Sequence, residues 1–135
     1  MSAVHVRVQV RGEVYAVPVE QVLEVAELGE VTPVPGAPAN VIGVRNLRGE
    51  ILPVVDLASV CGLGAGEPAR ILVAEHAGHR VAFAVDEISD VNPLSEAEQE
   101  TGSDLLTGAA LEAGSLVGVL DVARIFALLD RQEAA

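Results

Sequence analysis

The chain carries the sequence GEVYAVPVEQVLEV at residues 12–25, and a similar sequence, GHRVAFAVDEISDV, follows at residues 78–91. The second copy begins 66 residues after the first (78 minus 12), and the copies agree at one Gly, one Ala and two Val positions. A further match follows at a shift of 65 residues, between GEILPVVDLA at 49–58 and GSLVGVLDVA at 114–123. A repeat of this length predicts two similar structural units.

The two copies differ most clearly at one turn. Where the first copy has Asn46-Leu47-Arg48, the second has Leu111-Glu112-Ala113. A position at which two similar units disagree is a candidate for function, so this turn is considered again below.

The composition favours a mainly β domain. A chain of 135 residues suffices for one compact domain or for two small, closely packed units. Half of the residues are hydrophobic but only 2% are aromatic, so the core must be built from Val, Leu, Ala and Ile. Val is a strand former, and short apolar runs separated by turns are typical of small barrels or sandwiches.

The charge balance limits the classes of partner. The formal net charge is −12, from 20 acidic and 8 basic residues, and every basic residue is Arg. Nucleic acids and anionic membrane surfaces are bound by basic faces, so we expect neither nucleic-acid binding nor direct membrane insertion. An acidic surface instead suits a partner with basic patches.

The sequence also lacks the signals of secretion. A single Cys excludes an intrachain disulfide and fits a reducing compartment. The first residues contain no basic region followed by an apolar run, and no apolar stretch reaches the roughly 18 residues needed to cross a membrane. We therefore expect a cytoplasmic protein.

Apolar patterns predict most of the regular elements. Alternating valines indicate a strand over 4–10, and a turn at 11–13 pairs it with 14–17 as a hairpin. Further strands are predicted over 41–47, 51–57, 70–75, 80–85 and 116–120, with single helical turns near 19–23 and 58–61. Ser95 to Asp104 is polar and acidic, which indicates a loop with at most a helical turn, and a C-terminal helix is expected after Asp121.

The glycine-rich stretch at 62–68 is the natural seam between the two units. We expect a single domain over residues 1–135. One subdomain would cover about 12–62 and the other about 70–122, while the N-terminal strand and the C-terminal helix can pack across both.

Two histidines suggest a metal site, but the pattern is incomplete. His76 and His79 flank a predicted hairpin turn, and Glu75 is the only other obvious ligand close to them in the sequence. A bound metal needs three or four ligands. We therefore expect no metal and no other cofactor, and we expect the histidines to lie on a solvated turn.

No enzymatic arrangement is evident either. Cys61 has no base or orienting group near it in the sequence, and a small apolar Cys is usually a core residue. The run Gly62-x-Gly64-x-Gly66 lacks the strand–turn–helix context of a phosphate-binding loop, so it indicates a linker. Asp56 and Asp121 each follow a strand and are expected to cap the next element. We expect no catalytic residues.

Arg48 is the strongest candidate for a binding residue. It precedes a turn glycine between two apolar strands, in a chain with few cations. The simpler interpretation is an exposed turn arginine. The functional interpretation is that a rigid hairpin holds the guanidinium on the surface, where a partner binds it. Arg is enriched among interface anchors. Asn46 can orient the turn through bonds to its own backbone.

The sequence around Arg48 is specific enough to indicate a family. VTPVPGAP at 31–38 is followed by VIGVRNLRGEILPVVDL at 41–57. Together these strongly resemble the CheW family, the chemotaxis coupling proteins. Residues 15–25, 85–91 and 106–108 fit the same family, so the resemblance spans nearly the whole chain.

The resemblance implies a fold and a function. The fold is mainly β, with two pseudo-repeated five-stranded SH3-like barrel subdomains packed on a shared apolar core, short helices and a C-terminal helix. The function is that of a non-enzymatic adaptor. Members link methyl-accepting chemoreceptors to the histidine kinase CheA by binding its C-terminal regulatory domain. Such a protein is cytoplasmic and recruited to membrane-associated receptor arrays.

The resemblance also implies site residues. In the family, the receptor's cytoplasmic helical tip docks in a groove between the subdomains. The matching positions here are Val22, Glu24, Asn46 and Arg48, with Gly43 and Gly49 shaping the backbone. The kinase contact uses edge surfaces of the barrels and is not assigned to individual residues.

Two alternatives remain open at this point. The same scaffold could serve pilus-based motility or another receptor–kinase pathway, which the sequence does not separate from chemotaxis. A small-molecule- or metal-binding β-barrel is the alternative from a different class. Its support is limited to His76, His79 and an apolar interior.

Overall fold

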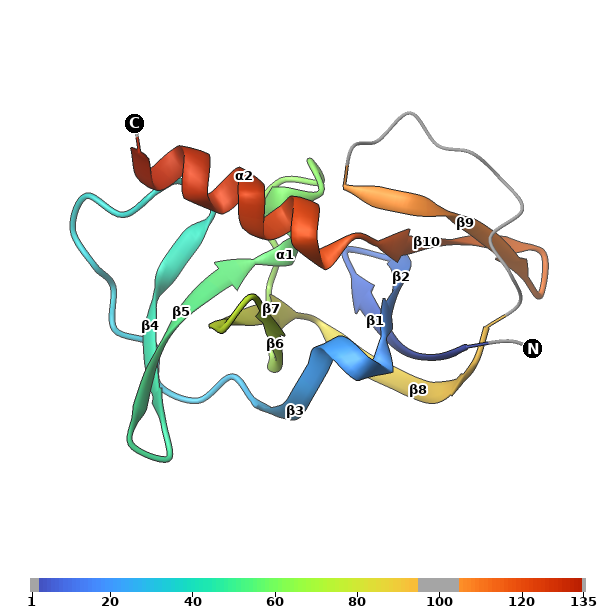
Figure 1. Ribbon diagram of the computed structural model, residues 1–135, viewed down its shortest axis with the longest axis horizontal. Coiled ribbons are helices and arrows are strands. Elements are labelled where there is room, and N and C mark those ends of the chain that lie inside the picture. Colours follow the sequence, from blue (N-terminus) through green and yellow to red (C-terminus); the bar gives the residue numbers. More distant parts are fainter. Residues whose placement is uncertain (1–2, 95–104, 135) are drawn as a thin grey trace.

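The computed structural model describes residues 3–94 and 105–134, with side chains up to residue 130, and this part of the chain is mainly β (Figure 1). The strands are β1 (Val4–Val10), β2 (Glu13–Pro18), β3 (Val22–Glu27), β4 (Val41–Leu47), β5 (Glu50–Asp56), β6 (Arg70–His76), β7 (His79–Val85), β8 (Glu87–Pro93), β9 (Leu106–Glu112) and β10 (Ser115–Leu120). The helices are the 3-10 turn η1 (Val19–Gln21), α1 (Leu57–Val60) and α2 (Val122–Ala134).

The elements predicted from apolar patterns are confirmed, with small shifts at their ends. No range was predicted for three strands, β3, β8 and β9, and the helical turn expected near 19–23 ends at Gln21, where β3 follows. The loop expected from Ser95 to Asp104 lies outside the described residues.

The strands form two five-stranded sheets. One sheet has the order β8-β1-β2-β10-β9 and the other has the order β3-β6-β7-β5-β4. Neighbouring strands are antiparallel, except for the parallel pairs β2–β10 and β5–β7. We call the first the β8–β10 sheet, although it also contains β1 and β2, and we call the second the β3–β7 sheet. The two sheets have the same topology.

The two repeats exchange their first hairpins. In the sequence repeat, β1 to β5 correspond in order to β6 to β10. In the structure, β1 and β2 join β8, β9 and β10, while β6 and β7 join β3, β4 and β5. Each sheet thus takes two strands from one repeat and three from the other, so neither repeat can complete a sheet by itself.

The sheets do not follow the predicted subdomains of about 12–62 and 70–122. The strands of the β3–β7 sheet run from residue 22 to residue 85, across the glycine-rich stretch at 62–68. That stretch connects α1 to β6 beside a single sheet and is not a seam between sheets. The boundaries were misplaced because a sequence repeat reports which strands are alike, and not which strands pair.

Four hairpin turns share one backbone geometry. In each, a non-glycine residue with positive φ precedes a glycine with positive φ, at Arg11-Gly12, Arg48-Gly49, Ala77-Gly78 and Ala113-Gly114. Two consecutive residues with positive φ form the type I′ turn, whose twist matches that of the flanking strands. The same strained position holds Arg twice and Ala twice. The fold therefore dictates the backbone at Arg48 but leaves its side chain free for another role.

The main core lies between the two sheets. Its buried side chains include Val8 and Val17 from one sheet, Val55 and Phe83 from the other, and Ile125 from α2. Each sheet also has a smaller apolar cluster of its own. The predicted mainly β fold, with two five-stranded units on a shared apolar core, is confirmed.

Neither sheet closes into a barrel through its ladder alone, but other contacts join its edges. In the β3–β7 sheet, Thr32 follows the edge strand β3 and forms a bridge with Val44 of the opposite edge strand β4. In the β8–β10 sheet, buried Arg7 donates to the Pro93 carbonyl of β8 at 3.0 Å and to the Glu112 carboxylate of β9 at 2.8 Å. The hydrogen bond to Glu112 raises the pKa of Arg7 and lowers that of Glu112.

Two substitutions on one strand test this packing. We expect Val55→Asp to unfold the protein and Ile51→Asp to leave it folded, because Val55 is 1% exposed and Ile51 is 59% exposed. An unpaired buried carboxylate costs several kcal/mol, which is comparable with the roughly 5–15 kcal/mol that stabilises a whole domain. Circular dichroism during heating measures both variants. A cooperative, wild-type-like transition for Val55→Asp would contradict the buried position of this strand.

Candidate partner-binding site

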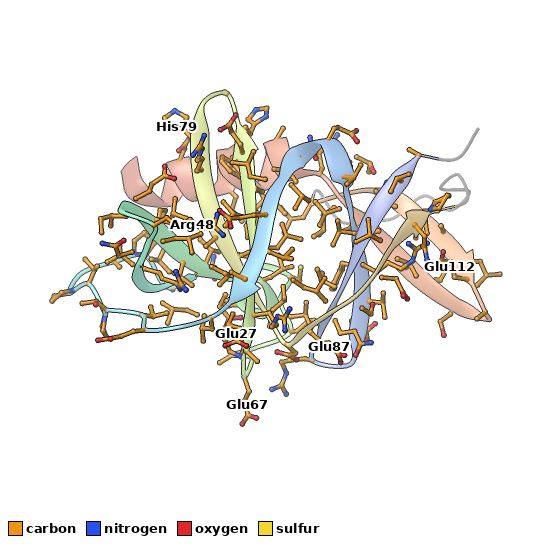
Figure 2. The ribbon with its side chains drawn as sticks, turned by 90° about the horizontal axis from the view of Figure 1, so that it is seen from below. Glu27, Arg48, Glu67, His79, Glu87 and Glu112 are labelled. Carbon is orange, nitrogen blue, oxygen red and sulfur yellow. The ribbon has the colours of Figure 1, made fainter. Side chains whose placement is uncertain are left out.

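The turn between β4 and β5 carries Arg48, which is labelled in Figure 2 and has an exposed side chain. Arg48 and Gly49 have φ angles of 53° and 88°. The Gly49 N–H donates a hydrogen bond of 2.8 Å to the side-chain oxygen of Asn46. Asn46 therefore fixes the turn through the backbone, as its place in the sequence indicated.

Arg48 forms an ion pair with Glu24 of β3. The nitrogen–oxygen distance is 2.9 Å, and the side chains of Arg48 and Glu24 are 77% and 29% exposed. Because β3 and β4 are the two edges of one sheet, this pair spans the opening between them. An exposed pair contributes about 0–1 kcal/mol, so the guanidinium can turn to a partner at little expense of stability.

Gly43 lets the two edges approach each other. A Cβ added to Gly43 would overlap the Thr32 carbonyl, whose carbon would be 2.8 Å away. The Thr32 N–H donates to the Val44 carbonyl at 2.8 Å, and the Val44 N–H donates to the Thr32 carbonyl at 2.9 Å. Gly43 therefore shapes the backbone beside the Arg48 turn by allowing this bridge, while Gly49 does so by its positive φ.

The side chain of Val22 is not openly available for contact with a partner. It is half-buried and packs against the main core. The exposed apolar side chains nearby on β3 are Leu23 and Val25, which are 46% and 43% exposed. On β5, Ile51 lies across from Asn46 and is also exposed. The sequence analysis did not select these three residues, because simple alternation along 22–27 would place Glu24 outward and its apolar neighbours inward.

Arg45 is a further residue that the sequence analysis did not select. Its Nε donates to the Leu28 carbonyl at 2.7 Å, which ties the segment after β3 to β4. Gly29 makes room for this contact, because an added Cβ would lie 2.6 Å from Arg45 Nε. Arg45 thus joins β4 to the segment that follows the opposite edge strand. A lone Arg inside a strand carries no local signal for this role.

The two candidate histidines form a cross-strand pair at the β6–β7 hairpin. The ring of His76 packs edge-on against Phe126 of α2, with centroids 5.9 Å apart. Within residues 3–94 and 105–134, no group of three or more His, Cys, Asp or Glu residues is placed to hold a metal ion. The described structure therefore provides no third ligand beside the two histidines.

The remaining polar candidates have structural surroundings. Asp56 accepts a hydrogen bond from the Ala58 N–H at 3.1 Å and caps α1, while Asp121 accepts one from the Arg124 N–H at 3.1 Å and caps α2. Both capping predictions are confirmed. Cys61 packs against the main core, and its burial raises the pKa of the thiol to about 11. A hydrogen bond with Tyr15 opposes part of that increase.

These features define a class of protein. The described chain combines an exposed cation, exposed apolar strand residues and paired sheet edges on a rigid β scaffold, which is the arrangement of a domain that docks other proteins. In the described part of the chain, no helix has both the length and the apolar character needed to cross a bilayer.

Comparison with known proteins gives the family. A family model for the CheW-like domain matches residues 5–130, and the chain belongs to this family. It is 30% identical over 131 residues to the chemotaxis protein CheW of Rhizobium meliloti, covering 89% of this chain and 84% of that protein. It is 33% identical over 85 residues to protein FrzA of Myxococcus xanthus, covering 61% and 53%.

The fold has a solved relative. The crystal structure of the scaffolding protein TtCheW from Thermoanaerobacter tengcongensis matches with a TM-score of 0.83 and 26% sequence identity. The match covers 93% of this chain and 88% of that one. The family resemblance inferred from the Arg48 region is thereby confirmed.

The edge contact at Gly43 can be tested against a turn glycine. We expect Gly43→Ala to destabilise the protein by about 2–3 kcal/mol, because the new methyl group would push Thr32 away from β4. In the control Gly114→Ala, an added Cβ meets no atom within 4 Å and the only cost is the positive φ, about 1–2 kcal/mol. Chemical denaturation measures both. Equal effects would show that the bridge does not depend on Gly43.

The environment of Cys61 predicts an unreactive thiol. With a pKa of about 11, the thiolate is a small minority at pH 8 and grows only as the pH approaches that value. We expect iodoacetamide to alkylate the folded protein at pH 8 at least tenfold more slowly than it alkylates free glutathione. Mass spectrometry follows the reaction, and the unfolded protein in denaturant is the control. Fast alkylation of the folded protein would contradict this burial.

Proposed function

We propose that this protein is a non-enzymatic adaptor that couples methyl-accepting chemoreceptors to a CheA-type histidine kinase in the cytoplasm. The observation that carries the proposal is the CheW-like domain match over residues 5–130. Relatives with this domain are named chemotaxis proteins, and the solved relative is called a scaffolding protein. Through its partners, the adaptor would be recruited to membrane-associated receptor arrays.

The proposed receptor contact is the face around Arg48. Arg48 and Glu24 supply one positive and one negative charge, and Asn46 holds the turn that carries the arginine. The exposed side chain of Ile51, which lies across from Asn46, adds apolar area at this turn. A helical receptor tip can bury such apolar area while the charged residues set its orientation.

Val22 and the two glycines have supporting parts in this proposal. Val22 packs β3 onto the main core and so fixes the strand that bears Glu24. Gly43 and Gly49 set the backbone of the edge bridge and of the turn. Substituting them would disturb receptor binding through the geometry of the Arg48 face.

The equivalent turn of the β8–β10 sheet has a different surface chemistry. It carries Ala113 in place of Arg48, and the nearby Leu111 and Leu116 are 60% and 58% exposed. An adaptor needs non-equivalent surfaces for two partners. We therefore assign the kinase regulatory domain to sheet-edge surfaces other than the Arg48 face.

A second candidate keeps the mechanism and changes the pathway. The match to FrzA shows that a protein named apart from CheW carries a similar sequence. The same adaptor could thus serve another receptor–kinase pathway, such as pilus-based motility. The pathway is defined by which receptor tip and which kinase domain bind.

Arg48→Ala should weaken receptor binding while leaving the fold intact. A substitution at an anchor residue in a protein interface costs roughly 2 kcal/mol or more, so we expect the receptor-tip affinity to fall at least about tenfold. Binding to a purified receptor signalling tip and to the kinase regulatory domain is measured separately by isothermal titration calorimetry.

Arg70→Ala is the matched control for Arg48→Ala. Arg70 is an exposed arginine on β6, and no side-chain partner is seen for it in the described structure. Its loss should change neither affinity. Unchanged receptor binding by a folded Arg48→Ala variant would refute the site assignment, and failure of the wild-type protein to bind either partner would refute the adaptor function.

A further inference from the structure

A cleft separates the C-terminal half of α2 from the sheet beneath it. Its volume is about 250 Å³. Apolar residues form most of its wall, and polar residues lie among them. The lining residues are Pro38, Val41, Pro53, Val55, His79, Arg80, Val81, Phe126, Leu129 and Asp130.

The crossing of α2 between the sheets creates this cleft. The helix begins directly after β10 of one sheet and crosses to the other (Figure 1), where it contacts β6. Phe126 anchors it there through edge-on contacts with His76 and Phe83, at 5.9 and 6.2 Å between ring centroids. Leu129, one turn further on, still packs into the main core, and the cleft lies beside it.

The charges at the cleft are unbalanced. The Arg80 guanidinium donates to Glu75 at 2.9 Å and to Glu50 at 3.0 Å, so its charge is already paired. Within the described part of the chain, the side chains of Asp130 and His79 show no partner. Among the described side chains, which end at Asp130, this carboxylate shows no countercharge, which favours a cationic group in the occupant.

The volume of the cleft limits the size of the occupant. Sites for drug-sized ligands usually measure roughly 300–1,000 Å³, and a cavity of roughly 150 Å³ holds one benzene ring. A cleft of about 250 Å³ accordingly fits one large apolar side chain and part of its neighbour. That is the size of the anchor by which a protein segment inserts into an interface pocket.

We propose that this cleft is a docking site for a protein segment in which a large apolar side chain stands next to Arg or Lys. The apolar side chain fills the space beside Pro38, Val41 and Pro53, which are half-exposed at the cleft, and the basic residue pairs with Asp130. The cleft borders the Arg48 turn, because Arg80 in its wall pairs with Glu50, two residues after Arg48. None of its lining residues is a proposed receptor-contact residue, so this contact goes beyond the proposed receptor and kinase contacts. It would give the protein a third partner site.

Two dipeptides of opposite charge test the proposal on the full-length protein. The probes are acetyl-leucyl-arginine amide and acetyl-leucyl-glutamate amide, titrated into ¹⁵N-labelled protein and followed by NMR. We expect the arginine peptide to shift the amide signals of Val81, Phe126 and Leu129 with a Kd of about 1 mM. The glutamate peptide should bind at least threefold more weakly.

Two substitutions separate the apolar contact from the charge contact. Val41→Met narrows the cleft and should abolish binding of both dipeptides. Asp130→Asn should remove the preference for arginine while leaving the apolar contact. Glu67→Gln is the matched control, because Glu67 lies at the opposite end of the molecule from His79 (Figure 2) and its loss should change nothing.

Several results would overturn the proposal. These are absence of binding, equal binding of the two dipeptides, or binding that survives Val41→Met in a folded protein. If n-hexylamine bound as tightly as the arginine peptide, the cleft would be a small-molecule pocket instead. If the same signals shifted on dilution of the protein alone, the occupant would be a second copy of this chain. None of these results bears on receptor or kinase binding, which is measured separately.

Discussion

The apolar layer shared by the two sheets is the constraint on which the rest of the structure depends. Because the repeats exchange their first hairpins, the strands of each repeat contribute to both sides of this layer. The sheets therefore cannot shift relative to each other without exposing the same buried valines. The turns at Arg48 and Ala113, which differ in chemistry, are held at fixed positions on one rigid body, as an adaptor that orients two partners requires.

Local patterns in the sequence were sufficient for most strands but not for their pairing. The alternating valines of β1 and the turn glycines identified the hairpins directly. β8 was missed because it is an exposed edge strand with mixed polar residues, and β9 because its centre, Gly108-Ala109-Ala110, is small and does not alternate. The exchange of hairpins joins residues about a hundred positions apart, and no local pattern records it.

The candidate site was predictable where the backbone sets it. The Asn46–Gly49 turn follows from glycine and asparagine chemistry, and the structure shows the bond between them. The neighbours of Arg48 depend on three-dimensional arrangement. A β-bulge between Val22 and Glu24 changes which side chains of β3 face outward, and Glu24 reaches Arg48 only because the two sheet edges meet. The apolar pattern of the sequence indicates neither the bulge nor the meeting of the two edges.

The exchanged hairpins also affect the order in which the chain can fold during its synthesis. All strands of the β3–β7 sheet are available once residue 85 has been made, whereas the other sheet needs β1 and β2 together with β10, which ends at Leu120. The N-terminal hairpin must therefore wait, with an unpaired edge, while most of the chain is produced. Unpaired edges of this kind are prone to incorrect association. The first hairpin is thus the part of the nascent chain that keeps an unpaired edge for longest.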